Sequence, residues 1–259
     1  MKYSVSTCSF VKLKVKRLLA LPEDIGVEIF YEYGSEEYWE EFLSRFRQTH
    51  SGGVSIHSPF AFYDFSVPGD DAELFEHFKK AFGLYHRFDC EFYVLHAFNN
   101  IDMITGKEHA DEYRSRSIER IGKFDQICKA EGIQLAVENT FGNPYNLFSQ
   151  EQWLGMFASF PDLHALIDVG HALVAGMSIE QMQATLRDRI VGYHLHNNDT
   201  SRDSHSRILD GTMKWEPFVE NARKYTPNAA GVIEYLVEDR MEACVEDIRF
   251  LEKLSRDAR

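Results

Sequence analysis

Short runs of apolar residues recur along the whole chain, and longer amphipathic stretches separate most of them. A run of four to eight apolar residues bounded by polar turns is typical of a buried β-strand. Eight short segments are interpreted as such strands, at residues 2–7, 26–31, 53–57, 91–96, 133–138, 164–168, 190–196 and 231–235. The sequence therefore predicts eight strands with helical segments between them.

The helical segments carry their own start and stop signals. In the stretch 71–85, Leu74 and Phe78 fall on one apolar stripe, and Asp70 precedes it like an N-cap. In 112–131 the apolar residues again recur at helical spacing, and Gly132 follows as a C-terminal stop. Further helices are expected at 36–46, after Ser149, after Ser178 and over 240–255.

Strands that alternate with helices form parallel sheets of the α/β class, and eight of them favour closure into a (β/α)8 TIM barrel. A chain of 259 residues suits one such barrel as a single domain over 1–259. The alternative, an open doubly wound sheet, usually has a glycine-rich turn after its first strand. This sequence has none.

The alternation of side chains along a strand assigns each residue to the barrel axis or to the surrounding helices. In 133–138, Ile133, Leu135 and Val137 share the helix-facing side, so Glu138 faces the axis. The same count makes seven of the eight strands end with an inward ionisable residue: Glu28, His57, His96, Glu138, Asp168, His194 with His196, and Glu234. Active sites of these barrels lie at the carboxyl ends of the strands.

Carboxylates and imidazoles gathered in a buried place cost several kcal/mol each unless they are paired. A divalent cation removes that cost, and the mixed oxygen and nitrogen ligands suit Mn²⁺, Co²⁺, Mg²⁺ or Zn²⁺. Glu138, Asp168, His194 and Glu234 are the predicted metal ligands. His171, three residues after Asp168, is a candidate for a second metal or for the substrate. A helix-capping role for Asp168 is the structural alternative.

Composition narrows the class of partner. The formal net charge of −13 disfavours binding to a phosphate backbone, so nucleic acid is an unlikely partner. Four cysteines without a C-x-x-C pair are typical of reduced thiols in a cytoplasmic protein. We find no signal peptide and no apolar run long enough to span a membrane, and therefore expect a cytoplasmic location.

Several motifs resemble those of the xylose isomerase-like TIM-barrel superfamily. They are AVENT (136–140), IDVGHALVAG (167–176), YHLHNND (193–199), the pair Asp203 and His205, and VIEY (232–235). That superfamily contains sugar isomerases and epimerases, some dehydratases, and the endonuclease IV class of nucleases (AP endonuclease family 2).

The resemblance implies different metal sites in the different branches. In the isomerases and epimerases, one metal is held by residues matching Glu138, Asp168, His194 and Glu234, and the two glutamates move protons. The nucleases bind three zinc ions and add residues matching His57, His96, His171, Asp203 and His205. All of these residues are present in this chain.

Three features favour an isomerase or epimerase acting on a sugar or a sugar-derived keto compound. The chain is acidic, its loops lack basic clusters, and the loops after the strands are rich in aromatic residues that pack on sugars. These are Phe60, Phe62, Tyr63, Phe65, Phe98, Phe141, Tyr145 and Phe148.

The expected mechanism is a metal-stabilised enediolate, with Glu138 and Glu234 as the acid and base. His57 and His196 are candidates to hydrogen-bond substrate hydroxyls. Glu28 is interpreted as structural or as a support for a ligand. The alternatives are a three-zinc phosphodiesterase, a dehydratase and an inactive sugar-binding barrel, and the protein is a possible homo-oligomer.

Overall fold

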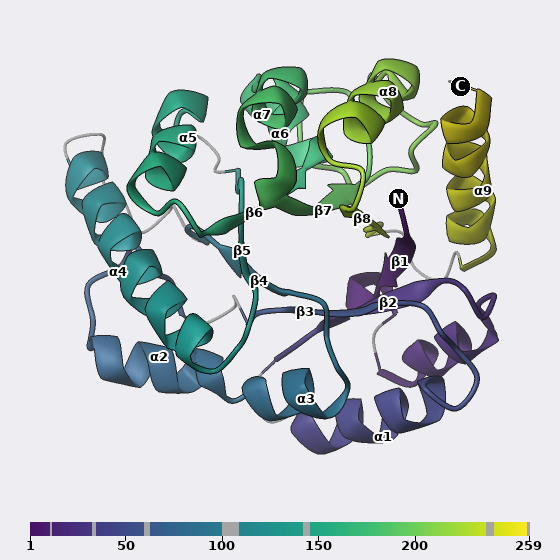
Figure 1. The fold of residues 1–259 in the computed structure, drawn as a ribbon, viewed down its shortest axis with the longest axis horizontal. Helices are drawn as coiled ribbons and strands as arrows, with labels where there is room; N and C mark the ends of the chain where they lie inside the picture. Colours follow the sequence, from purple (N-terminus) through teal and green to yellow (C-terminus); the bar gives the residue numbers. More distant parts are fainter. Residues whose placement is uncertain are drawn as a thin grey trace.

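Eight parallel strands close into a barrel in sequence order, with β1 paired to β8 (Figure 1). The computed structural model describes residues 1–10, 12–32, 35–59, 63–99, 109–141, 146–236 and 241–257. The strands are β1 (Tyr3–Ser6), β2 (Gly26–Phe30), β3 (Val54–His57), β4 (Tyr93–His96), β5 (Leu135–Glu138), β6 (His164–Asp168), β7 (Ile190–Leu195) and β8 (Ala230–Ile233). The predicted (β/α)8 barrel is confirmed.

Helices surround the strands on the outside of the barrel (Figure 1). They are α1 (Glu36–Phe46), α2 (Asp71–Lys79), α3 (Phe82–Arg87), α4 (Ala110–Ala130), α5 (Gln150–Ser159), α6 (Val169–Ala175), α7 (Ile179–Leu186), α8 (Trp215–Tyr225) and α9 (Met241–Asp257). Within the described residues, the connections also contain the 3₁₀ segments η1 (Thr7–Ser9), η2 (Lys12–Ala20) and η5 (Arg187–Arg189). After β1, η2 takes the place of an α-helix.

The helix boundaries follow the capping signals in most places. Ser149 and Gln152 form a complete capping box at the start of α5. Asp70 accepts a hydrogen bond from the backbone N–H of Glu73, and so begins α2 as expected. The single helix predicted over 71–85 is wrong, because the structure divides this stretch into α2 and α3.

Two apolar regions on opposite sides of the strands account for most of the buried residues. The larger lies between the outer side of the strands and the helices and contains Leu135, Val137 and Ile167. The smaller fills the barrel interior with Phe92, Val94, Ala136, Leu166, Ala230 and Val232. The residues of β4, β5, β6 and β8 in these two regions therefore have the parity predicted from the sequence, and the inward positions change from apolar to ionisable toward the carboxyl end.

In the described part of the chain, no helix combines the length and the apolar character needed to cross a bilayer.

Candidate metal centre

The four predicted ligands meet at the carboxyl end of the barrel. Glu138, Asp168, His194 and Glu234 are all buried, with exposed fractions of 1%, 0%, 0% and 4%. The Nδ1 atom of His194 lies 3.1 Å from Glu234 Oε2, 3.5 Å from Glu138 Oε2 and 3.6 Å from Asp168 Oδ2. Three carboxylates and one imidazole thus converge on one small volume, which we call the central cluster.

Two atoms of the central cluster show that a cation fits it. Within the part of the chain that the structure describes, Glu138 Oε2 and His194 Nδ1 are buried and have no hydrogen-bond partner. Buried polar atoms are rarely left unpaired, because each one costs roughly 1–3 kcal/mol. A divalent cation accepts electron pairs from oxygen and nitrogen together, so the donor set suits Zn²⁺, Mn²⁺ or Co²⁺.

A second cluster lies on the side of β3 and β4. The Nε2 atoms of His57 and His96 are 3.0 Å apart, and they lie 3.5 Å and 3.1 Å from Glu138 Oε2. Glu138 therefore belongs to both this group, the β3–β4 cluster, and the central cluster. The ring of Phe30 stacks on His57 at 4.2 Å between centroids and closes this side of the site.

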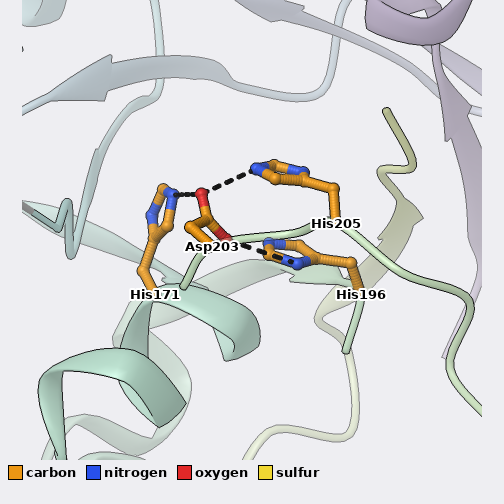
Figure 2. Close-up of side chains that lie close together, drawn as sticks. All are labelled: His171, His196, Asp203 and His205. Atoms are coloured by element: carbon orange, nitrogen blue, oxygen red, sulfur yellow. Dashed lines mark hydrogen bonds and ion pairs between the residues drawn. The ribbon is translucent and has the colours of Figure 1, made fainter. Parts of the chain in front are cut away.

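A third cluster, the outer cluster, consists of His171, His196, Asp203 and His205 (Figure 2). Asp203 Oδ2 lies 3.2 Å from His171 Nε2 and 2.9 Å from His205 Nε2. The imidazoles of His196 and His205 stack at 3.8 Å with an interplanar angle of 6° (Figure 2). All six additional candidates from the sequence thus lie beside the central cluster, in two groups.

The comparison with family models agrees with the fold. Residues 22–254 match the model described as the xylose isomerase-like TIM barrel. The chain belongs to this family. No curated protein sequence matches it.

Several solved structures resemble the chain over its whole length at low sequence identity. A D-tagatose 3-epimerase-like protein has a TM-score of 0.86 at 18% identity, covering 100% of this chain and 98% of its own. An L-ribulose 3-epimerase has 0.79 at 15%, covering 99% and 95%. An IolI protein with a bound zinc atom has 0.76 at 16%, covering 100% and 98%.

In this protein, most of the site histidines form a hydrogen bond through one ring nitrogen, and the other ring nitrogen then faces a cluster. His57 Nδ1 bonds to the carbonyl of Ser58 at 2.8 Å, and His205 Nδ1 bonds to the carbonyl of Glu234 at 3.0 Å. Such bonds fix the tautomer and the direction of the free nitrogen, as around metal-binding histidines generally.

His194 is held by a carboxylate. Its Nε2 atom donates to Glu28 Oε1 at 2.9 Å, and Ser55 donates to the other oxygen of Glu28 at 2.8 Å. Glu28 is fully buried and lies on β2, opposite Ser55 of β3 in the sheet register. Glu28 therefore holds the imidazole of His194, a predicted ligand, and Ser55 in turn holds Glu28. The sequence could have indicated Ser55, because it lies on the same inward face of its strand as His57.

Asp168 caps a helix with one carboxylate oxygen and faces the site with the other. Its Oδ1 accepts the backbone N–H of His171 at 2.6 Å and begins α6, a short helix that was not predicted. Its Oδ2 accepts His196 Nε2 at 2.9 Å within the site. The side chain of Asn139 bonds to both the backbone N–H and the carbonyl of Asp168, at 2.8 and 2.9 Å. Asn139 therefore fixes the end of β6.

Gly170 makes room for His196. A Cβ atom at position 170 would lie 1.9 Å from His196 Cε1, far inside any permitted contact. The first turn of α6 can therefore carry no side chain here, and the imidazole packs directly on the helix backbone. The close contact with His196 explains why the motif IDVGHALVAG has glycine at position 170.

Charges within the site oppose the effect of burial on the pKa values. Burial raises the pKa of Glu138, but the imidazoles of His96 and His194 outweigh it and hold the pKa well below the ordinary value. Burial lowers the pKa of His205, but Asp203 and the neighbouring carboxylates raise it to about 8. For His194, burial again lowers the pKa, and Glu234 and Glu28 raise it well above normal.

The loop that carries Asp203 and His205 is anchored outside the site. Arg207 makes two hydrogen bonds to Asp247 of α9, at 3.0 and 2.7 Å. The hydroxyl of Tyr235 donates to Asp247 at 2.7 Å and accepts the backbone N–H of Ile208 at 3.1 Å. Arg207 thus holds the loop, and because its guanidinium is paired with Asp247, little of its charge remains to bind a substrate phosphate.

The loop aromatics occupy other places than expected. Phe65, Phe98 and Phe148 are 1–2% exposed and belong to the large apolar core, so the prediction that they line a sugar pocket is wrong. Tyr63 stacks on His77 at 3.8 Å, and Phe141 is half-buried. The remaining residues of that prediction, Phe60, Phe62 and Tyr145, lie outside the described residues.

Proposed function

We propose that the protein is a metal-dependent isomerase or epimerase acting on a sugar or a sugar-derived keto compound. The observation that carries this proposal is the placement of two glutamates around one imidazole nitrogen. Glu138, from β5, and Glu234, just after β8, both lie within 3.5 Å of His194 Nδ1. A reaction that removes a proton from one carbon and returns it elsewhere needs two such groups close to the substrate.

Glu138, Asp168, His194 and Glu234 would hold the divalent cation. When bound, such an ion supplies Lewis-acid polarisation of a carbonyl oxygen and of a neighbouring hydroxyl. The metal identity follows from the donor set only as a class, namely Mn²⁺, Zn²⁺, Co²⁺ or Mg²⁺.

The two glutamates each have an oxygen outside the central cluster. Glu138 Oε1 lies 3.1 Å from His171 Nδ1, and Glu234 Oε1 accepts a hydrogen bond from Ser6 at 3.4 Å. Because both carboxyls have lowered pKa values, both are ionised near neutral pH and either can accept a proton. One glutamate would take the proton next to the substrate carbonyl. The other would first take up a proton from solvent and would then deliver it to the carbon from its own side.

Solvent-proton exchange tests the proposal. The metal-loaded protein is incubated with a panel of ketoses and aldoses in deuterated water, and deuterium at carbon is followed by NMR. We expect uptake with at least one sugar and its loss in Glu138→Gln, which removes the base and keeps the shape. Glu91→Gln is the matched control, because Glu91 pairs with Lys2 on the surface. Exchange that persists in Glu138→Gln would exclude the proton-transfer role.

A metal-dependent phosphodiesterase is the second candidate, because one observation favours it. The β3–β4 cluster and the outer cluster flank the central cluster, and Glu138 lies between them at 3.1 Å from both His96 and His171. Three adjacent metals would suit phosphate ester cleavage. Three zinc ions per chain together with hydrolysis of bis(4-nitrophenyl) phosphate would support this candidate. One tightly bound metal with sugar exchange would support the isomerase.

A further inference from the structure

The side-chain amide of Asn99, three residues after the end of β4, bonds to two neighbours at once. Its Nδ2 atom donates to the carbonyl oxygen of Tyr63 at 2.8 Å, and its Oδ1 atom lies 2.7 Å from His96 Nδ1. A backbone carbonyl oxygen can only accept, so the amide nitrogen faces Tyr63 and the amide oxygen faces His96. Because that oxygen can also only accept, His96 donates from Nδ1.

The loop after β3 fixes Asn99 through its main chain as well. The backbone N–H of Asn99 donates to Asp64 Oδ2 at 2.9 Å. The other oxygen of Asp64 accepts the backbone N–H and the hydroxyl of Ser66, at 2.7 and 2.6 Å. The amide of Asn99 therefore cannot rotate without breaking its bond to this loop, and the direction of its oxygen is set by a tertiary contact.

His57 has the same form as His96 for a different reason. Its Nδ1 atom lies 2.8 Å from the carbonyl oxygen of Ser58, which can only accept, so Nδ1 is the donor here too. A neutral imidazole carries one proton, and the hydrogen bond of one ring nitrogen decides the state of the other. The Nε2 atoms of His57 and His96 therefore each present an electron pair.

These two electron pairs point into the β3–β4 cluster. The two Nε2 atoms are 3.0 Å apart, and Glu138 Oε2 lies 3.5 Å from that of His57 and 3.1 Å from that of His96. Three acceptor atoms that face one another repel and attract a cation. A proton on Nε2 of His96 would remove this repulsion, because His96 could then donate to His57 or to Glu138 and the cluster would satisfy itself.

We propose that Asn99 is a positioning residue that holds His96 in the Nδ1-protonated tautomer and so keeps the β3–β4 cluster open to a cation. Without the amide oxygen, His96 would carry its proton on Nε2 and close the cluster with an internal hydrogen bond. The proposal goes beyond the proposed function, because it concerns the state of the cluster and holds for a sugar isomerase and for a phosphodiesterase alike.

The tautomer of His96 can be measured without metal or substrate. The full-length protein is labelled with ¹⁵N-histidine, freed of metal, and recorded at an alkaline pH by long-range ¹H–¹⁵N correlation NMR, with the signals of His96 identified by their loss in His96→Gln. We expect protonated Nδ1 and unprotonated Nε2 in the wild type. A wild-type His96 with its proton on Nε2 would overturn the proposal.

Three variants separate the amide oxygen from the rest of the side chain. Asn99→Leu keeps the shape and removes both polar atoms, so we expect the proton on Nε2 and a ¹⁵N–¹⁵N coupling to His57 across the new hydrogen bond. Asn99→Asp restores an oxygen for His96 Nδ1 and should restore the wild-type tautomer. Asn228→Leu is the matched control, because Asn228 is exposed and precedes β8 at the opposite end of the barrel from the site.

Zinc binding gives the consequence for the cluster. Competition with a chromophoric chelator should show zinc bound at the β3–β4 cluster about tenfold more weakly in Asn99→Leu than in the wild type, and little change in Asn99→Asp or Asn228→Leu. The wild-type tautomer in folded Asn99→Leu, a changed tautomer in Asn99→Asp, or equal zinc number and affinity in wild type and Asn99→Leu would each overturn the proposal. None of these results depends on turnover of a sugar.

Discussion

The carboxylate of Glu28 should strengthen metal binding although it does not face the central cluster. Its Oε1 lies 2.9 Å from His194 Nε2, and both side chains are fully buried. The bond directs the opposite nitrogen, Nδ1, toward Glu138, Asp168 and Glu234. Glu28→Gln keeps the size of the side chain, an acceptor for His194 and a partner for Ser55, but removes the negative charge.

The size of the effect follows from the kind of hydrogen bond. Bonds to charged groups contribute about 1.5–3 kcal/mol, and neutral bonds about 0.5–1.5 kcal/mol. A loss of about 1.4 kcal/mol corresponds to about tenfold in affinity. This lies at the lower end of the roughly 10–100-fold range seen for groups that support metal ligands.

Competition with a chromophoric chelator, at one fixed neutral pH, measures the change in zinc or manganese affinity. Glu91→Gln provides the control, since it removes a carboxylate that pairs with Lys2 on the surface. We expect about a tenfold weaker metal complex in Glu28→Gln and no change in Glu91→Gln. Unaltered affinity in Glu28→Gln, with the protein folded, would refute the reasoning that this carboxylate fixes His194.

Four further predictions concern other parts of the site. The zinc affinity of the outer cluster should fall as the pH falls below about 8. His205 has a pKa of about 8, so below this pH a proton competes with the metal for its imidazole. A zinc affinity that stays constant across pH in calorimetry would contradict this. Gly170→Ala should displace His196 and lower the metal content of the outer cluster, as elemental analysis would show, whereas Gly155→Ala, where the new Cβ meets open space, should not. Arg207→Met leaves the buried Asp247 without its cation and should lower the free energy of unfolding by about 3 kcal/mol. An unchanged denaturation midpoint would argue against the role of Arg207 in anchoring the loop. Chelation of the metal should lower the melting temperature, since a ligand at about 1,000 times its Kd stabilises by about 4 kcal/mol, and the loss should reverse on adding metal back.

The pattern along the chain was sufficient to predict the barrel and the ends of its strands. Strand parity depends only on alternation, so it correctly placed Glu138, Asp168, His194 and Glu234 toward the axis before any contact was known. Closure of the barrel then brings those ends together, because each strand pairs with its neighbour in sequence and the last pairs with the first.

The sequence alone did not determine how the ionisable groups divide into clusters, because this depends on distances across the barrel. That Glu138 lies near both His96 and His171 follows from the packing of strands and of α6 against one another. The support of His194 by Glu28 joins residues 166 positions apart, and no local pattern encodes such a pair.

The location of the aromatic loop residues was also not determined by the sequence alone. A phenylalanine after a strand has the same local pattern whether it packs in the core or lines a pocket. Tertiary structure placed Phe65, Phe98 and Phe148 in the core and stacked Phe30 on the ring of His57 beside the site. The physical reason is that hydrophobic burial is non-directional, so only the packed arrangement of all the elements decides which apolar side chains a substrate can reach.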